Sequence, residues 1–464
     1  MKIIVIGDGN VGDTLIRYIS GEGHSVTVID TSAVRINRVV NQYDVQGVVG
    51  NGASHDIQQE AGVKDADLLI AVAGSDELNM VCCMLAKKLG ARRAIARVRN
   101  PEYFREMGFL RDYLEIDLVV NPEFEAAREI TRLIRFPAAL KLDAFAKGRV
   151  DMAEIYISAG HPLADKKLAS LASAFGVSVL VCAVRRGEEV VIPGGDFVIR
   201  EGDSISITAS HKDLSVFFGR LGLLGKPIRS VMIMGGGHSA FYLATGLLSL
   251  GIRTHIVERD EARARELAER LPQASIICGD CTDGELLEEE GIDEMDACVM
   301  LTSNDEINVL ISMFARTHGI EKIISRVDSE GFVKMLPAGL GADSIISPRD
   351  ISAETVLRYL RGLDNSKKTE RGEGASEHSA IQTLYKLCDG AVEALEFNVD
   401  RSFRALGVPF MSSEFKMKKN TLIASIVRRN TVIFPHGSST LEEGDSVIIV
   451  TSNPQLSDLN DILA

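Results

Sequence analysis

The sequence predicts an α/β protein with two doubly wound parallel sheets, each followed by a small α+β domain. Three observations lead to this fold class. Residues 2–12 join a buried apolar strand to the glycine pattern G-x-G-x-x-G and then to an amphipathic segment. Strand and helix patterns then alternate, which is typical of a parallel sheet with right-handed crossovers. The whole pattern returns from residue 231, so the chain is a tandem duplication of one nucleotide-binding unit.

The glycine pattern opens the first unit. Gly7 permits a tight turn, Gly9 lets the backbone approach a pyrophosphate, and Gly12 lets the following helix pack on the strand. The helix that starts near residue 10 turns its free N–H groups toward the phosphates. Residues 25–30 predict a second strand that ends in Asp30, which can accept both ribose hydroxyls. We therefore expect a Rossmann-like nucleotide site at Gly7, Asp8, Gly9, Asn10, Val11, Gly12 and Asp30.

The other elements of the first unit follow in order. Helices are expected over about 11–20, 33–42, 53–61 and 75–89, the last capped by Ser75 or Asp76, with a further helix from 100. Strands are expected over 45–49, 67–73 and 94–98. Ligands of such sheets lie at the carboxyl ends of the strands. The expected site there adds Asn51, Gly52, Ala73, Gly74, Ser75, Asp76 and Arg97, where Arg97 is either a salt-bridge residue or a phosphate contact.

The second copy aligns with the first in detail, with residues 67–79 matching 296–308. Its Ala240 replaces the third glycine and keeps close helix packing. His238 is either a histidine of a surface loop or a phosphate or pH-sensitive contact. The candidate residues of this second site are Gly235, Gly236, Gly237, His238, Ser239, Ala240, Glu258, Asp280, Thr302, Ser303, Asn304 and Arg326.

Charged residues bear on the choice of ligand. Asp8 places a carboxylate in the first glycine loop, where it repels a polyphosphate unless it points outward or a cation intervenes. This favours a dinucleotide over ATP at the first site. No arginine directly follows Asp30, which favours an unphosphorylated ribose, whereas Arg259 follows Glu258 and leaves a different ligand open for the second site.

Each nucleotide unit is followed by a shorter segment that predicts a mainly antiparallel sheet. Alternating strands, a hairpin at 184–187 or 427–430, and a Glu-Gly-Asp turn at 201–203 or 443–445 recur in both segments. The expected domains are residues 1–136, 137–222, 228–362 and 380–464. The polar run over 364–377 is interpreted as a flexible linker or loop.

Composition limits the class of protein. The chain has 464 residues and a formal net charge of −14, which argues against a nucleic-acid partner. Seven cysteines, mostly within apolar runs, fit a reducing cytoplasm. Cys278 and Cys281 form a C-x-x-C pair that we interpret as buried or incidental thiols, with redox sensing and metal binding as alternatives; no metal site is expected. Residues 230–252 lack full charges but carry three consecutive glycines, so a membrane span is not expected.

The order of modules resembles the RCK (or KTN) family, regulators of potassium conductance. The resemblance rests on the Gly7–Gly12 loop, Asp30, the helix start at 73–79 and the hairpins that end in Glu-Gly-Asp. It is strongest to the tandem-RCK cytosolic subunits of bacterial Trk potassium uptake systems. It implies NAD(H) or ATP/ADP as ligand, a homotetrameric ring, and gating of an integral membrane potassium-translocating subunit of the Trk or Ktr type from the cytoplasmic face of the membrane.

Two other functions are compatible with a duplicated nucleotide unit. One is an NAD-dependent oxidoreductase, which needs an acid or base beside the nicotinamide. The small segments carry no His–Asp or Tyr–Lys pair at a telling spacing, so no catalytic residue is expected. The other is a soluble nucleotide-sensing or redox-sensing scaffold without a channel partner.

Overall fold

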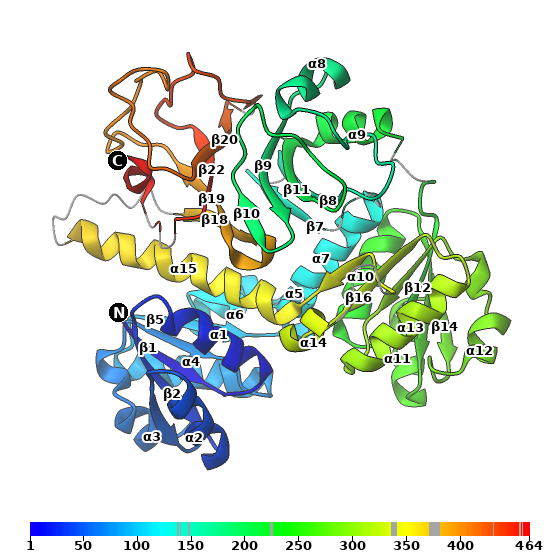
Figure 1. The fold of residues 1–464 in the computed structure, drawn as a ribbon. Helices are drawn as coiled ribbons and strands as arrows, with labels where there is room; N and C mark the ends of the chain where they lie inside the picture. Colours follow the sequence, from blue (N-terminus) through cyan, green and yellow to red (C-terminus); the bar gives the residue numbers. More distant parts are fainter. Residues whose placement is uncertain are drawn as a thin grey trace. The chain divides into compact units, whose positions relative to one another are not determined.

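The computed structural model describes residues 1–136, 139, 141–146, 149–222, 226–335, 341–370, 381–429, 431–453, 456 and 458–464. They form two compact units, and each unit is assembled from two separate segments of the chain. The first unit combines Met1–Thr131 with Ile228–Leu357, and the second combines Arg132–Pro227 with Arg358–Ala464. The first unit contains two parallel sheets and the second contains two antiparallel sheets (Figure 1). The domain limits expected from the sequence remain a prediction.

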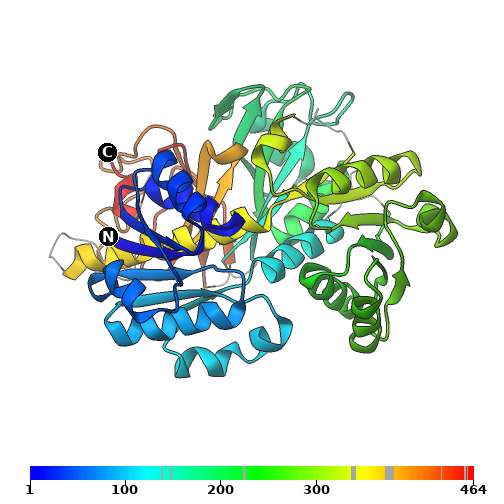
Figure 2. The same ribbon diagram turned by 90° about the horizontal axis from the view of Figure 1, so that it is seen from below.

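The first parallel sheet has the strand order β3-β2-β1-β4-β5-β6. All of its described neighbours run parallel. Helices cover both faces of this blue-coloured sheet (Figures 1 and 2). Its elements are β1 (Lys2–Ile6), α1 (Asn10–Ser20), β2 (Ser25–Asp30), α2 (Ala33–Gln42), β3 (Gln46–Val49), α3 (His55–Glu60), η1 (Val63–Asp65), β4 (Leu68–Ala71), α4 (Asp76–Leu89), β5 (Arg93–Arg97), α5 (Pro101–Arg105), α6 (Met107–Tyr113), β6 (Leu118–Val120) and α7 (Pro122–Arg135).

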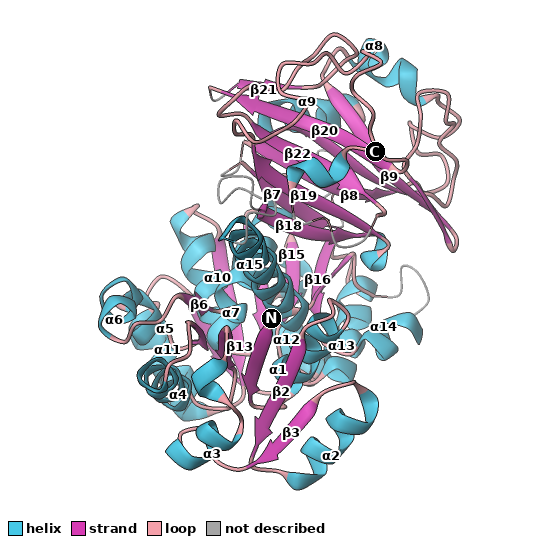
Figure 3. Cartoon of the chain, turned by 90° about the vertical axis from the view of Figure 1, so that its left-hand side faces the viewer, coloured by secondary structure: helices cyan, strands magenta, loops and turns pink. Residues whose placement is uncertain are grey.

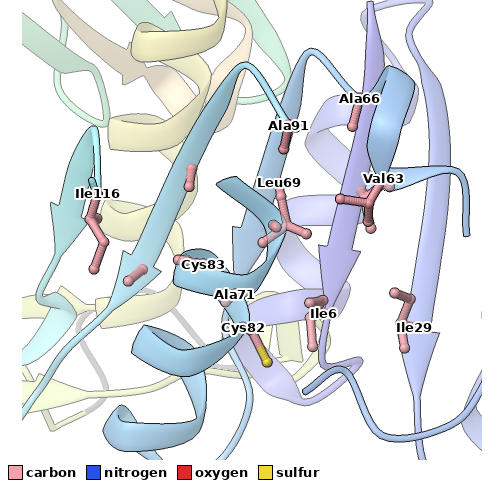
Figure 4. Packing of buried hydrophobic residues seen from close by; sticks show 14 of the residues in the cluster. Ile6, Ile29, Val63, Ala66, Leu69, Ala71, Cys82, Cys83, Ala91 and Ile116 are labelled. Atoms are coloured by element: carbon pink, nitrogen blue, oxygen red, sulfur yellow. The ribbon is translucent and has the colours of Figure 1, made fainter. Parts of the chain in front are cut away.

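Burial on both faces explains why the central strands are continuous apolar runs. In β1, four successive residues, Ile3 to Ile6, are buried, as are all four residues of β4. Cys82 and Cys83 of α4 pack with Ile6 and Leu69 of these strands (Figure 4). Burial raises the pKa of the Cys82 thiol to about 12, so it stays protonated and packs as a small apolar side chain.

The second parallel sheet repeats the order as β14-β13-β12-β15-β16-β17. The duplication predicted from the sequence is therefore present at the level of strand topology. Its elements are β12 (Ser230–Met234), α10 (His238–Ser249), β13 (Arg253–Glu258), α11 (Glu261–Arg270), β14 (Ser275–Cys278), α12 (Gly284–Glu289), η3 (Ile292–Glu294), β15 (Ala297–Met300), α13 (Asp305–Thr317), β16 (Lys322–Arg326), α14 (Glu330–Met335), β17 (Ser344–Ile346) and α15 (Pro348–Glu370).

The second unit contains two five-stranded sheets with matching orders, β7-β8-β11-β9-β10 and β18-β19-β22-β20-β21. The first strand of each, β7 or β18, is an edge strand that the sequence pattern did not reveal. The elements of the first are β7 (Lys141–Phe145), β8 (Val150–Tyr156), η2 (Leu168–Ser170), α8 (Leu171–Phe175), β9 (Val179–Arg186), β10 (Glu189–Val191), β11 (Ser204–Ser210) and α9 (His211–Arg220). Those of the second are β18 (Ile381–Leu387), η5 (Cys388–Gly390), β19 (Val392–Asn398), β20 (Thr421–Arg428), β21 (Thr431–Ile433), β22 (Ser446–Thr451) and η6 (Leu459–Ile462).

The two small sheets share one hydrophobic core. Phe145, Met152 and Cys182 of the first sheet belong to the same buried cluster as Ala394 and Ile448 of the second. The magenta strands of this unit lie together in Figure 3. Neither sheet buries its apolar face alone, so each stabilises the other.

One expectation about the connection is wrong. Residues 364–370, predicted to be part of a linker, continue the helix α15, while 371–377 lie outside the described residues. The segment is polar, but Lys and Glu are good helix formers and no glycine or proline interrupts it before residue 372. Among the described residues, no helix is both long enough and apolar enough to cross a membrane.

Candidate functional site

The first glycine loop is a tight turn between β1 and α1. Gly7 has a φ of +98°, and a Cβ there would lie 2.9 Å from the backbone of Ala73. A Cβ on Gly12 would lie 1.9 Å from the Gly7 oxygen, so α1 begins in direct contact with the loop. At Gly9, by contrast, a Cβ would have no heavy atom within 4 Å. This open side of the loop is where a ligand can approach the backbone.

The helices that follow the two glycine loops begin without a side-chain cap. Gly9 precedes α1 and Gly237 precedes α10. Among the described residues, no side chain accepts a hydrogen bond from the first-turn amides of these two helices. The neighbouring helices α2, α4, α11 and α13 are capped by Ser32, Ser75, Asp260 and Asn304. Uncapped amides at a helix N-terminus bind anions, so both loops fit a phosphate group.

Asp30 lies at the end of β2 with its carboxylate against the glycine loop. Its Oδ2 accepts a hydrogen bond from the Asp8 amide and its Oδ1 accepts one from the Ser32 amide, each at 2.8 Å. In the second copy, Glu258 accepts from the Gly236 amide at 2.7 Å and from the Asp260 amide at 2.8 Å. Each carboxylate oxygen can accept a further hydrogen bond, so both carboxylates can also hold ribose hydroxyls.

The ends of β3 and β14 carry the next pair of candidates. Asn51 is exposed and its Oδ1 accepts from the Ala53 amide, while Asp280 accepts from the amide and the hydroxyl of Thr282. These hydrogen bonds lower the pKa of Asp280. A Cβ at the neighbouring Gly52 would overlap Ile6, whereas the second copy has Cys281 at this position, opposite the unbranched Met234.

Asn79 and Asn308, buried in α4 and α13, hold the loops at the ends of β4 and β15. Asn79 accepts from the Ala73 amide and donates to the carbonyl oxygens of Ala73 and Arg97. Asn308 makes the same contacts with Thr302 and Arg326. The exposed Gly74 and Ser303 stand on these loops. Asp76, at the first turn of α4, accepts from the amides of residues 99 and 100 and so joins the loop to the end of β5.

The two copies differ in the arginine that ends β5 or β16. Arg97 donates to the Ala73 carbonyl at 2.7 Å, and burial lowers its pKa. Its Nε has no partner among the described residues. Arg326 instead donates to Asp328 at 2.6 Å. Arg97 thus lies at the ligand edge of the first sheet with its Nε–H free to donate, whereas the charge of Arg326 is compensated by Asp328. Arg99, which the sequence analysis missed, also donates to this edge, at the Gly74 carbonyl.

His238 is the first residue of α10, so its interpretation as a surface loop histidine is wrong. It is half-buried. Burial, together with the nearby Arg263 and Arg99, lowers its pKa. His238 is therefore uncharged at neutral pH. Ser239 and Ala240, which follow it, are buried against the sheet.

Asp8 does not point outward, but a cation lies beside it, which is the second of the two conditions under which the sequence allowed an anionic ligand. Its side chain is fully buried, and its Oδ2 lies 3.2 Å from a guanidinium nitrogen of Arg38 in α2. Burial raises the pKa of Asp8, and Arg38 opposes this effect. The second copy has Gly236 here, where a Cβ would lie 2.6 Å from a Leu267 methyl carbon and 2.8 Å from a Glu258 carboxylate oxygen.

The two thiols of the C-x-x-C pair have different surroundings. Cys278 is exposed, while Cys281 packs against the buried core of the second sheet. Burial raises the pKa of Cys281 to about 11. No group of three or more His, Cys, Asp or Glu side chains among the described residues is placed to hold a metal ion. Redox sensing by this pair remains a hypothesis.

Known protein families match the chain with the same duplication that the two sheets show. The TrkA-N domain family matches residues 3–122 and again 231–348, and the TrkA-C domain family matches 152–222. The Trk system potassium uptake protein TrkA of Vibrio alginolyticus is 31% identical over 457 residues, covering 98% of this chain and 96% of that protein. The chain belongs to the TrkA family. A TrkA homolog of Archaeoglobus fulgidus is also 31% identical over 467 residues and covers both chains completely.

Solved structures share the fold of this TrkA-family chain. The GsuK channel aligns with a TM-score of 0.63 at 19% identity, covering 97% of this chain and 77% of the other. The GsuK channel bound to NAD aligns with a TM-score of 0.61. These similarities establish the tandem RCK fold that the sequence predicted.

Proposed function

We propose that this TrkA-family chain is a nucleotide-sensing regulatory subunit that gates a potassium-translocating membrane protein from the cytoplasmic side. The observation that carries the proposal is the repeated combination of an uncapped helix behind an open glycine loop and a carboxylate held against that loop. NAD(H) fits this combination, since the amides face phosphates and Asp30 or Glu258 faces the ribose. The potassium part of the proposal is inferred from the relatives, which are named as Trk system potassium uptake proteins.

Binding controls gating only if the nucleotide prefers one conformation of the assembly. Residues from the two copies meet within the first unit, where Tyr242 of α10 donates to the Arg99 carbonyl and accepts from Asn121, each at 3.0 Å. Arg99 in turn holds Gly74 and Asp76 at the first ligand edge. A nucleotide that moves the loop at Gly74, or the glycine loop before α10, therefore acts on the contact between the copies. In this scheme NADH is a signal, and no hydride transfer takes place.

Substitution of the two carboxylates tests the sites separately. Asp30→Ala and Glu258→Ala are each expected to weaken nucleotide binding at their own site by about 10- to 100-fold, because charged hydrogen bonds to the ribose are lost. Titration of NADH, NAD+, ATP and ADP by calorimetry measures this, and each variant serves as the control for the other site. Potassium flux through the reconstituted membrane subunit should lose its nucleotide response in the same variants. Steady NADH oxidation with carbonyl substrates, or unchanged affinities in both variants, would contradict the proposal.

Assembly into a ring, which we propose as a tetramer, is supported by an apolar surface that both copies repeat. Val81 and Met84 of α4 are 44% and 40% exposed, and Leu310 and Met313 at the equivalent positions of α13 are 63% and 38% exposed. Each pair lies three residues apart and so shares one helix face. Exposed apolar surface that recurs in the same place favours burial against another copy of the chain.

The surface can be tested by charge. The double variant Val81→Glu and Leu310→Glu is expected to reduce the oligomer to smaller species, because carboxylates would be buried at the interface. Light scattering coupled to size exclusion measures the mass. Val34→Glu is the matched control, since Val34 is 80% exposed but has alanine at the equivalent position of the second copy. An unchanged mass in the double variant, or the same loss in the control, would remove this surface from the assembly.

A further inference from the structure

Two arginines of α2 lie beside the ribose carboxylate of the first site. Arg35 lies 3.6 Å from Asp30, and Arg38 lies 3.2 Å from both Asp8 and Asp13. An arginine in this neighbourhood is what nucleotide-binding sheets use to accept the 2′-phosphate of NADP. By position alone, α2 therefore offers the first site a means of binding a phosphorylated ribose.

These arginines are already paired. Asp8, Asp13 and Asp30 supply three carboxylates against the two guanidinium groups of Arg35 and Arg38. We call these five residues the ribose-side cluster. Its formal charge is negative, so a 2′-phosphate placed there would meet net repulsion and would have to compete with carboxylates for Arg38.

Asp8 is the most deeply buried carboxylate of the cluster. Its side chain has no exposed surface, while 53% of the Arg38 side chain and 33% of the Asp13 side chain are exposed. The Asp8 amide donates to Asp30 at 2.8 Å, so the residue is held from the backbone as well. Its Oδ1 has no hydrogen-bond partner among the described residues. A buried carboxylate with one unsatisfied oxygen retains a strong attraction for its one cation, so Arg38 stays turned toward Asp8.

The second copy lacks this arrangement. Gly236 stands in place of Asp8, Phe241 in place of Asp13, and Glu266 in place of Arg38. Arg263, the counterpart of Arg35, donates to the Gly236 carbonyl and to Glu266. The ribose-side cluster is therefore a property of the first site and cannot be a general requirement of the fold.

We propose that Asp8 is a specificity-determining residue, which holds Arg38 away from the ribose and restricts the first site to adenine nucleotides with a free 2′-hydroxyl. This inference rests on the proposed nucleotide-binding function. It differs from the usual account of such selectivity, in which the acidic residue at the end of the second strand alone excludes the 2′-phosphate. Here Asp30 binds the ribose hydroxyls, and Asp8 removes the arginine that would otherwise accept the phosphate.

The test compares NADH with NADPH, which differ only in the 2′-phosphate. All variants carry Glu258→Ala, so that the first site is measured against a weakened second site. The protein with Asp8 intact should bind NADH at least about tenfold more tightly than NADPH, by nicotinamide fluorescence and by calorimetry. Asp8→Ala should lower the ratio of the NADPH to the NADH dissociation constant by about tenfold or more, because Arg38 is released to the phosphate. Asp8→Asn preserves the shape of the side chain and should shift the ratio in the same direction.

Arg38 provides the matched control. Arg38→Ala added to Asp8→Ala should abolish the gain in NADPH affinity, whereas Arg38→Ala alone should leave NADPH weak. The inference is overturned if NADH binds but the ratio stays the same in both Asp8 variants, if the gain survives the loss of Arg38, or if the protein with Asp8 intact already binds NADPH as tightly as NADH. If that protein binds neither dinucleotide, the proposed binding of NAD(H) at the first site itself fails, which is a separate outcome.

Discussion

Gly12→Val is expected to abolish nucleotide binding at the first site and to destabilise the first unit by about 3 kcal/mol. The Cβ of any side chain at this position would lie 1.9 Å from the Gly7 oxygen and 2.9 Å from the Gly7 carbonyl carbon. Because both atoms belong to the backbone of the glycine loop, the loop and the start of α1 must separate. Urea unfolding and NADH titration measure the two effects. Gly12→Ala introduces the same Cβ contact without the γ-methyl groups of valine, so its two effects should have the same sign and be smaller.

Gly9→Ala is the matched control in the same loop. A Cβ there meets no heavy atom within 4 Å, and the φ of −85° suits any residue. The variant should keep its unfolding midpoint but lose nucleotide affinity, because the methyl group occupies the path of the pyrophosphate. Together the two variants separate the contribution of the loop to folding from its contribution to binding. A Gly12→Val protein of normal stability and affinity would show that the loop does not have the close contact described above.

Glu393→Ala is expected to cost the second unit about 3–5 kcal/mol. The guanidinium of Arg361 donates to both oxygens of Glu393, at 2.8 and 3.0 Å, and the two side chains are only 5% and 11% exposed. Removal of the carboxylate leaves a buried positive charge without its bidentate partner. Arg361 belongs to α15, so the ion pair also anchors this helix to β19. The loss should appear as a lower denaturation midpoint by calorimetry or circular dichroism.

The same small domain provides an exposed ion pair for comparison. Arg401 donates to both oxygens of Glu443 at 2.9 Å, but the side chains are 83% and 52% exposed. Glu443→Ala should therefore leave the midpoint unchanged within error. The double variant Arg361→Leu with Glu393→Leu should recover much of the stability lost in Glu393→Ala, because an apolar pair needs no charge compensation. Equal losses of stability in Glu393→Ala and Glu443→Ala would show that burial does not determine how much an ion pair contributes to stability.

Local sequence patterns predicted the parts of the fold that depend on neighbours in the chain. The strand β1, the turn at Gly7 and the helix α1 follow from an apolar run, a residue that accepts a positive φ and an amphipathic segment. Asp30 could be placed because the distance from the glycine loop to the end of the second strand varies little in this fold. The length of α15 was not predictable in this way, since its last residues are polar and helical propensity is a weak signal.

Contacts between distant segments decided the chemistry of the first site. Arg38 and Arg99 have no motif of their own, and their roles arise only when α2 and the end of β5 come beside the glycine loop. Asp8 looked like an obstacle to an anionic ligand because its sequence neighbours gave no sign of a cation. The cation comes from thirty residues further along the chain. Burial and pairing of this kind depend on tertiary packing, which periodicity does not encode.

By itself, the sequence determined that one Rossmann-like unit occurs twice, each copy with a glycine loop and an acidic residue at the end of the second strand, because these are short-range patterns with a direct steric or electrostatic cause. The tertiary structure decided that like segments combine, so that both parallel sheets form one unit and both antiparallel sheets another. Apolar faces that no single segment can cover drive this pairing, and a cluster such as Phe145 with Ile448 joins residues that are far apart in the chain. That the Asp8 carboxylate is buried beside Arg38 was likewise decided only when the chain folded.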